Sequence, residues 1–137
     1  MSLVLVTGGS RGLGFETAKA LRAQGHQIIL VSKDKDRLAE AASQLDCEYS
    51  AVDLADLDAA KKTFEEVLEN IGVPEILILA HGVMSAKMSK TLKTSDAEWR
   101  RVMSINLDSV FTLVNGLAPA MVEARSGRII IYSACLG

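Results

Sequence analysis

The chain switches repeatedly between short apolar runs and longer amphipathic stretches, and this alternation constrains its fold more than any other feature. The predicted strands cover residues 3–6, 27–31, 49–52, 76–80 and 128–133. The predicted helices between them cover residues 13–24, 35–44, 57–70 and 95–124. Short strands that alternate with helices of about ten or more residues form βαβ units around a parallel sheet. We therefore predict one doubly wound α/β domain over residues 1–137, with helices on both faces of the sheet.

Composition and charge exclude several classes of protein. The chain is 49% apolar and 23% charged with a net charge of −2, so a nucleic-acid binder that relies on a basic face is not expected. No unbroken apolar run approaches the roughly 18–20 residues of a membrane helix, and the start lacks the basic flank of a signal peptide. Cys47 and Cys135 are too few for a disulfide scaffold, and their spacing with His26 and His81 matches no metal site. We expect a cytoplasmic protein with no metal and no membrane-spanning segment.

A glycine-rich loop joins the first predicted strand to the first predicted helix. Its glycines have the spacing Gly-x3-Gly-x-Gly, which is neither the Gly-x-Gly-x-x-Gly form nor a Walker loop. Glycines at this place let the chain turn tightly and let its backbone approach a pyrophosphate, while the following helix offers unpaired N–H groups to the phosphate. The alternative is a turn that merely needs glycine. The dinucleotide-binding residues predicted in this loop are Gly8, Ser10, Arg11, Gly12, Leu13 and Gly14.

The loop and four later motifs resemble the short-chain dehydrogenase/reductase family over the whole chain. Val52-Asp53-Leu54 is similar to the family's segment with an acidic residue at the adenine, and Ala80-His81-Gly82 stands where the family usually has Asn-Ala-Gly. Residues 99–106 resemble the segment that carries its active-site Asn, and residues 127–133 resemble its fifth strand. The resemblance implies a Rossmann-type fold and a nicotinamide cofactor. It also implies cofactor contacts from Asp53, Leu54, Ala80 and Gly82 and a catalytic role for Asn106, which is otherwise a local helix kink or a solvated side chain.

The end of the second predicted strand indicates which nicotinamide cofactor would bind. An NAD site in this fold usually places Asp or Glu there to bind the ribose hydroxyls, whereas this chain has Ser32 followed by Lys33. A hydroxyl and an ammonium would hold a 2′-phosphate that a carboxylate would repel, and Arg11 is within reach of the same phosphate. The pattern favours NADP(H). Two alternatives stay open: Arg11 and Lys33 are ordinary solvated charges, or Asp34 serves a ribose.

The catalytic set that the resemblance implies is incomplete. The family uses a Tyr as proton donor or acceptor, a Lys four residues later, and a Ser that orients the substrate oxygen. Ala134 stands at the Ser position, and Ser133 is one residue early, on the opposite face of a strand unless a bulge intervenes. Neither Tyr49 nor Tyr132 is followed four positions later by Lys. We expect the chain to be the N-terminal part of a longer reductase, rather than a complete protein of 137 residues.

Three functions are compatible with these motifs. The leading hypothesis is an NADP(H)-dependent oxidoreductase that interconverts a carbonyl compound and an alcohol, with this chain supplying the cofactor-binding part. Such an enzyme would take a small-molecule substrate, and we expect a homo-oligomer at full length. The alternative is a non-catalytic dinucleotide-binding sensor or scaffold. A methyltransferase is disfavoured, because such sites usually want an acid after the second strand, where Ser32 and Lys33 stand.

Overall fold

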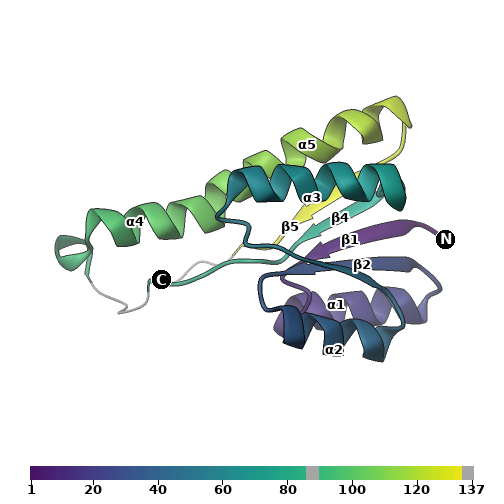
Figure 1. Cartoon of the computed structure of the whole chain (residues 1–137), viewed down its shortest axis with the longest axis horizontal. Helices are drawn as coiled ribbons and strands as arrows, with labels where there is room; N and C mark the ends of the chain where they lie inside the picture. The colour runs from purple at the N-terminus through teal and green to yellow at the C-terminus, as the bar shows by residue number, and fades with distance from the viewer. Residues whose placement is uncertain (86–89, 134–137) are drawn as a thin grey trace.

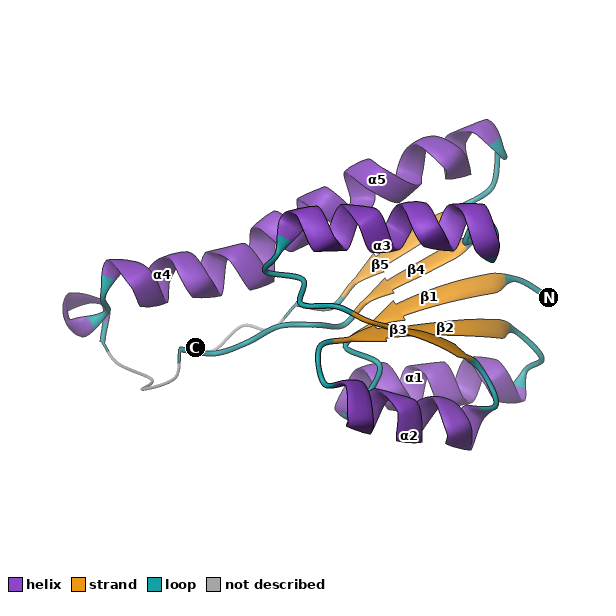
Figure 2. Cartoon of the chain, in the orientation of Figure 1, coloured by secondary structure: helices purple, strands orange, loops and turns teal. Residues whose placement is uncertain are grey.

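A computed structural model describes residues 1–85 and 90–133 and contains a parallel sheet between two layers of helices (Figure 1, Figure 2). Its strands are β1 (Leu3–Thr7), β2 (Gln27–Ser32), β3 (Glu48–Ala51), β4 (Ile76–Leu79) and β5 (Arg128–Ile131). Its α-helices are α1 (Gly12–Ala23), α2 (Lys35–Leu45), α3 (Leu57–Asn70), α4 (Asp96–Met103) and α5 (Ser109–Glu123). The strand order among the described residues is β3-β2-β1-β4-β5, with every pairing parallel. The prediction of a doubly wound α/β sheet is confirmed.

The two faces of the sheet pack against different helices. Leu5 of β1 joins a cluster with Phe64 of α3 and Leu117 of α5, whereas its neighbour Val4 joins a cluster with Ala18 of α1 and residues of α2. Successive side chains of a strand point to opposite faces, so nearly all buried positions of β1, β2 and β4 are apolar. Figure 2 shows α1 and α2 on one side of the sheet and α3 and α5 on the other. This is why the strands appear in the sequence as unbroken apolar runs.

Three of the five described α-helices begin at a side-chain cap, whereas α1 has none and α5 continues directly from the preceding helical turn. The side chains of Asp34, Asp56 and Ser95 each accept a hydrogen bond from the backbone N–H three residues later, at the starts of α2, α3 and α4. At the start of α1, Arg11 makes no such bond, and the first turn of that helix has no acidic residue. Within the described residues, α1 is therefore the helix that leaves a loop with its first N–H groups uncapped.

The predicted helix over 95–124 forms as one helical segment, Asp96–Glu123, which contains one wide turn. Residues Ser104–Asp108 form a π-helical turn between α4 and α5, which the apolar spacing does not predict. Although the sequence has no long unbroken apolar run, this segment is long and apolar enough by length and average composition to cross a membrane. The face of α5 that carries Leu113 and Leu117 is buried against the domain, so part of the segment serves the core.

The fifth strand is shorter than predicted. β5 ends at Ile131, so Tyr132 and Ser133 follow the strand rather than belong to it. Ala134 and Gly137, on which the expected position of the catalytic Ser depends, lie outside the described residues. All four residues of β5 are exposed, in contrast to the buried central strands.

Two helical glycines predict stability changes of opposite sign. A Cβ at Gly14 in α1 would lie 2.3 Å from the Gly8 carbonyl oxygen, whereas a Cβ at Gly116 in α5 would meet nothing within 4 Å among the described residues. We expect Gly14→Ala to lower the free energy of unfolding by about 1–3 kcal/mol, because backbone must shift. Gly116→Ala should raise it by about 0.5–1 kcal/mol through helix propensity. Urea unfolding of both variants measures the difference, and an equal effect of the two would contradict the close packing at Gly14.

Candidate functional site

A cavity of about 730 Å³ opens at the carboxyl ends of the central strands. The chain crosses in one direction from β1 to β2 and in the other from β3 to β4, which leaves a crevice where β1 and β4 end side by side. Open parallel sheets bind ligands at this switch point, and the volume falls within the range of roughly 300–1,000 Å³ common for small-molecule sites. The fold therefore provides one ligand-sized site in the expected place.

The structure brings all twelve predicted cofactor-binding residues to this cavity. They line it from the glycine loop, from the end of β2, from the segment after β3 and from the segment after β4. These residues are Gly8, Ser10, Arg11, Gly12, Leu13, Gly14, Ser32, Lys33, Asp53, Leu54, Ala80 and Gly82. Their shared placement agrees with a common ligand, while their binding role stays a prediction.

Six further residues line the cavity. They are Asp34, Arg37, Val52, His81, Val83 and Ile105. Asp34 is the alternative ribose contact expected from the sequence, whereas Arg37, Val83 and Ile105 are new. Arg37 had a weak signal, because it lies one helical turn after Asp34 in α2, directly beyond the end of β2. Ile105 had none, since only the folded chain brings the π-turn beside β4.

Backbone conformation explains the glycines of the loop. Gly8 and Gly12 have φ angles of +65° and +58°, a region that side chains rarely adopt. A Cβ at Gly8 would lie 2.9 Å from the backbone of Ala80 and His81, so the loop packs tightly on the segment after β4. Around Gly12 the described residues leave open space within 4 Å, and this glycine lines the cavity. A side chain there would project toward the place of a ligand.

The cavity wall near β2 carries charges of both signs. The Lys33 Nζ lies 3.4 Å from the Asp53 Oδ2, and the Arg37 Nε lies 4.0 Å from the Asp34 Oδ2. Asp34 also caps α2, which keeps its carboxylate turned toward that helix. Arg11 has no ion-pair partner in the part of the chain that the structure describes, so it is the cation available to a phosphate. It stands directly before the uncapped start of α1, whose dipole favours an anion.

His81 lines the cavity after β4, and its imidazole ring contacts the end of β1 and the start of α5. Its Nδ1 lies 2.6 Å from the hydroxyl of Thr7, the last residue of β1. Its Nε2 lies 2.7 Å from the hydroxyl of Ser109, the first residue of α5, and that hydroxyl donates to the Ile105 carbonyl in the π-turn. Burial lowers the pKa of His81 below its ordinary value of 6.5, although the Ile105 carbonyl opposes the shift. The ring is therefore neutral at physiological pH.

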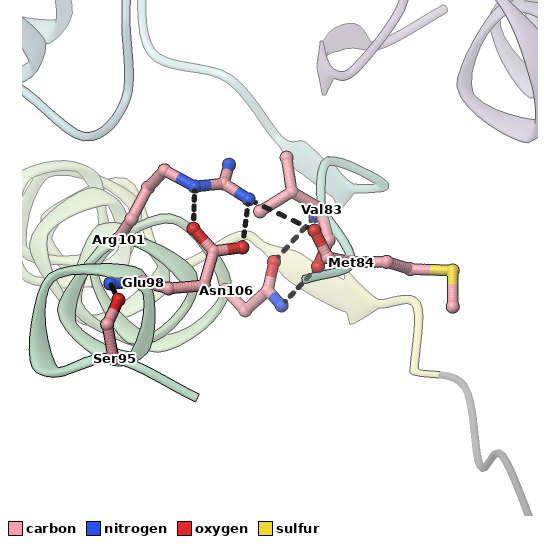
Figure 3. Close-up of polar contacts among 6 residues, drawn as sticks. All are labelled: Val83, Met84, Ser95, Glu98, Arg101 and Asn106. Carbon is pink, nitrogen blue, oxygen red and sulfur yellow. Dashed lines mark hydrogen bonds and ion pairs between the residues drawn. The ribbon is translucent and has the colours of Figure 1, made fainter. Parts of the chain in front are cut away.

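The candidate catalytic residue Asn106 is tied to the loop after β4 (Figure 3). Its side-chain Oδ1 accepts from the Val83 N–H and its Nδ2 donates to the Val83 carbonyl, both at 2.8 Å. Arg101 adds a second contact, because its guanidinium donates to the Met84 carbonyl while it pairs with Glu98. Asn106 thus lies in the π-turn, and its amide copies the pairing of a neighbouring strand. It adjoins the cavity through Ile105 rather than lining it.

Cys47 and the described acidic groups offer no metal site or reactive thiol in this region. Among the described residues, no group of three or more His, Cys, Asp or Glu side chains is arranged to hold a metal ion. Cys47 precedes β3, away from the cavity, and burial raises the pKa of its thiol to about 11. This thiol is protonated at neutral pH, which makes it a poor nucleophile.

Comparison with known proteins identifies relatives over nearly the whole chain. The profile of the short chain dehydrogenase family matches residues 2–137. Galactitol 2-dehydrogenase (L-tagatose-forming) from Cereibacter sphaeroides is 32% identical over 91% of this chain and 49% of its own length. A 3-oxoacyl-[acyl-carrier-protein] reductase from Salmonella typhimurium is 31% identical over 98% of this chain and 55% of its own. The chain thus spans about half the length of the curated relatives it matches.

Solved structures share the same arrangement. L-sorbose reductase from Gluconobacter frateurii, complexed with NADPH and L-sorbose, superposes with a TM-score of 0.87 at 28% identity, over 93% of this chain and 50% of that one. A metagenomic short-chain oxidoreductase in complex with NADP gives a TM-score of 0.91 at 29% identity, over 97% of this chain and 62% of that one. Both were solved with the phosphorylated form of the nicotinamide cofactor.

Proposed function

Because this chain belongs to the short-chain dehydrogenase family, we propose that it is the cofactor-binding part of an NADP(H)-dependent oxidoreductase that interconverts a carbonyl compound and an alcohol. The observation that carries the proposal is the uncapped start of α1, which opens into the cavity through a loop of cavity-lining glycines. An anion fits this place, because the first turn of α1 has no acidic residue that would repel it or take its place. The test is calorimetric titration of the chain with NADPH, and an absence of binding at millimolar nucleotide would refute it.

The residues of the cavity fit a dinucleotide in shape and charge. The described residues leave open space around Gly12, and the side chain of Arg11 does not cap the N–H groups at the start of α1, which suits a pyrophosphate. Arg11 would balance its charge. The bound nicotinamide would supply the hydride. The chain's own residues would bind and orient the cofactor and would exclude water. Val52 and Leu54 offer an apolar wall beside Asp53 for the adenine.

Cofactor preference follows from the end of β2. Lys33 and Ser32 line the cavity where a 2′-phosphate would lie, and the Ser32 hydroxyl is 3.1 Å from that of Ser10. Binding of the phosphate would draw Lys33 from Asp53, an exposed pair of small net value. We expect NADPH to bind roughly tenfold or more tightly than NADH, since a charge-assisted contact contributes about 1.5–3 kcal/mol.

The preference is measured by calorimetry with both nucleotides, and Lys33→Ala should reduce it. Lys19→Ala is the matched control, because Lys19 is an exposed lysine of α1 outside the cavity wall. Equal affinities of the unaltered chain for the two nucleotides, or an unchanged preference in Lys33→Ala, would refute the assignment.

A second candidate function is a non-catalytic dinucleotide-binding sensor or scaffold. It is motivated by Ala134 at the position of the family's Ser and by the lack of a Tyr-x3-Lys sequence in these residues. Finding Tyr-x3-Lys in an extended reading frame would favour the enzyme, and the intact mass of the expressed protein would establish its length.

In the enzyme, we propose Asn106 as a catalytic residue, with its amide fixed by Val83. We further propose a cytoplasmic homo-oligomer at full length.

A further inference from the structure

The buried histidine beside the cavity has a defined set of partners that its neutral form satisfies completely. The Ser109 hydroxyl donates its hydrogen to the Ile105 carbonyl. Its oxygen therefore faces His81 as an acceptor, and the ring must donate from Nε2. The Nδ1 then carries no hydrogen and accepts from Thr7. The other acceptor near Thr7, the Ile78 carbonyl, is more distant at 3.5 Å. The contacts therefore select one tautomer, with hydrogen on Nε2.

The same three contacts join segments that are far apart in the sequence. Thr7 ends β1 directly before the glycine loop, His81 follows β4, and Ser109 begins α5 after the π-turn. Ile105 of that turn and residues 80–83 line the cavity. The Asn106 amide holds the turn to Val83, which lies shortly after His81 in the sequence. The ring, through Ser109, and the amide therefore fix the turn at two points.

We propose that His81 is a positioning residue, which as the neutral Nε2–H tautomer fastens the π-turn to the ends of β1 and β4 and thereby shapes the inner wall of the cavity. The residue is not an acid or base for the reaction, because both ring nitrogens are engaged by Thr7 and Ser109. Its effect on nucleotide affinity rests on the proposed dinucleotide binding, whereas its tautomer and its effect on stability do not.

Burial lowers the pKa of His81, and no charged side chain of the described cavity wall offsets this effect. The charged groups of the cavity wall are Arg11, Lys33, Asp34, Arg37 and Asp53, and none of them contributes to the shift at His81. A second proton would enter on Nδ1, where Thr7 would have to turn its own hydrogen toward the distant Ile78 carbonyl. No described carboxylate repays the burial of that charge.

The pH dependence of stability follows in sign. Because folding lowers the pKa of His81, the unfolded chain binds more protons than the folded chain below the ordinary value of 6.5. This contribution to stability is complete above that value and is lost as pH falls through it. We expect His81→Asn to flatten the fall of stability on the acid side, whereas His26→Asn, which removes the histidine beside Ser2, should leave the contribution of His81 in place.

The direct test is ¹⁵N NMR of the histidine side chains in the unliganded chain. We expect His81 to show a protonated Nε2 and a bare Nδ1 at neutral pH, and Thr7→Val to change the Nδ1 signal by removing its donor. Thr7→Ser, which retains the hydroxyl, should give the same Nδ1 signal as the unaltered chain. A protonated Nδ1, a charged ring at neutral pH or an unchanged signal in Thr7→Val would overturn the proposal, whatever the chain binds.

The second test is the NADPH affinity of each variant, measured at one pH so that the charge of the 2′-phosphate is the same in every titration. His81→Asn and Thr7→Val should each weaken binding about tenfold, and Thr7→Ser should remain within about threefold of the unaltered chain. In the His81→Asn background, Ser109→Ala should add little, because the contact between the ring and Ser109 is already lost. Full affinity in a folded His81→Asn variant would overturn the positioning role. If the unaltered chain binds no NADPH, the proposed function fails. The NMR result then decides by itself whether His81 contacts Thr7 and Ser109 as the Nε2–H tautomer.

Discussion

Replacement of Gly12 by valine is expected to abolish NADPH binding by this chain while its far-ultraviolet circular dichroism stays close to that of the unaltered protein. Gly12 has a φ of +58° and open space where a Cβ would project, and it lines the cavity at the start of α1. A branched side chain there would occupy the place of the pyrophosphate. Loss of two charge-assisted backbone contacts corresponds to a loss in affinity of about 100-fold or more.

The matched control for this substitution is Gly25→Val. Gly25 has a φ of +89°, and the described residues likewise leave open space around it, but it lies at the far end of α1 outside the cavity wall. Both variants should lose about 1–2 kcal/mol of stability from the left-handed conformation. Only Gly12→Val should lose the nucleotide, as measured by calorimetry. Retained binding would mean that the loop is a structural turn only.

The 137-residue chain is expected to bind NADPH without consuming it in the presence of ketones or aldehydes. It carries Asn106 but has Ala134 at the position where the sequence predicts the family's Ser, and neither Tyr49 nor Tyr132 precedes a lysine by four residues. Without a positioned acid, only water would stabilise a developing alkoxide, and general acid–base help is worth about 10²–10⁴-fold in rate. The assay follows NADPH absorbance against a panel of carbonyl compounds.

A longer polypeptide that includes a Tyr-x3-Lys segment supplies the comparison for this activity prediction. It should gain turnover, and more so with Ala134→Ser, because the added hydroxyl would orient the substrate oxygen. Rapid turnover by the 137-residue chain itself would overturn the catalytic assignment. No turnover in a longer chain that binds NADPH would favour the sensor or scaffold.

The sequence predicts those parts of the molecule that local chemistry controls. The helix over 57–70 is placed correctly, because Asp56 caps it and Gly72 and Pro74 follow its end. The central strands are recognisable because both of their faces are covered, which favours a nearly continuous run of apolar residues. The glycine loop is equally local, since Gly8 and Gly12 adopt angles that favour glycine. These signals are sufficient to gather the predicted cofactor residues at one cavity.

Features that depend on how distant segments meet were beyond the sequence. The alternation of polar and apolar residues around Asn106 predicts an ordinary helix, because the wide turn gains its support from Val83 after β4. The sequence places His81 in the segment that stands where the family usually has Asn-Ala-Gly. Its partner Ser109 belongs to an element that no local signal connects to it. Arg37 reaches the cavity only because α2 begins directly after β2. Each requires knowledge of which strand lies beside which.

The strand order also has a consequence for the order of folding. Val4 of β1 pairs with Ile28 in β2 and with Ile76 in β4, a partner roughly three times as far along the chain. Closing the longer loop costs about 1 kcal/mol more in chain entropy, so β1 and β2 with α1 should associate first. The glycine loop would then exist before β4 arrives, but the opposite wall would not. Refolding chains should acquire helical structure before they acquire affinity for the nucleotide, and nucleotide binding would report the docking of β4.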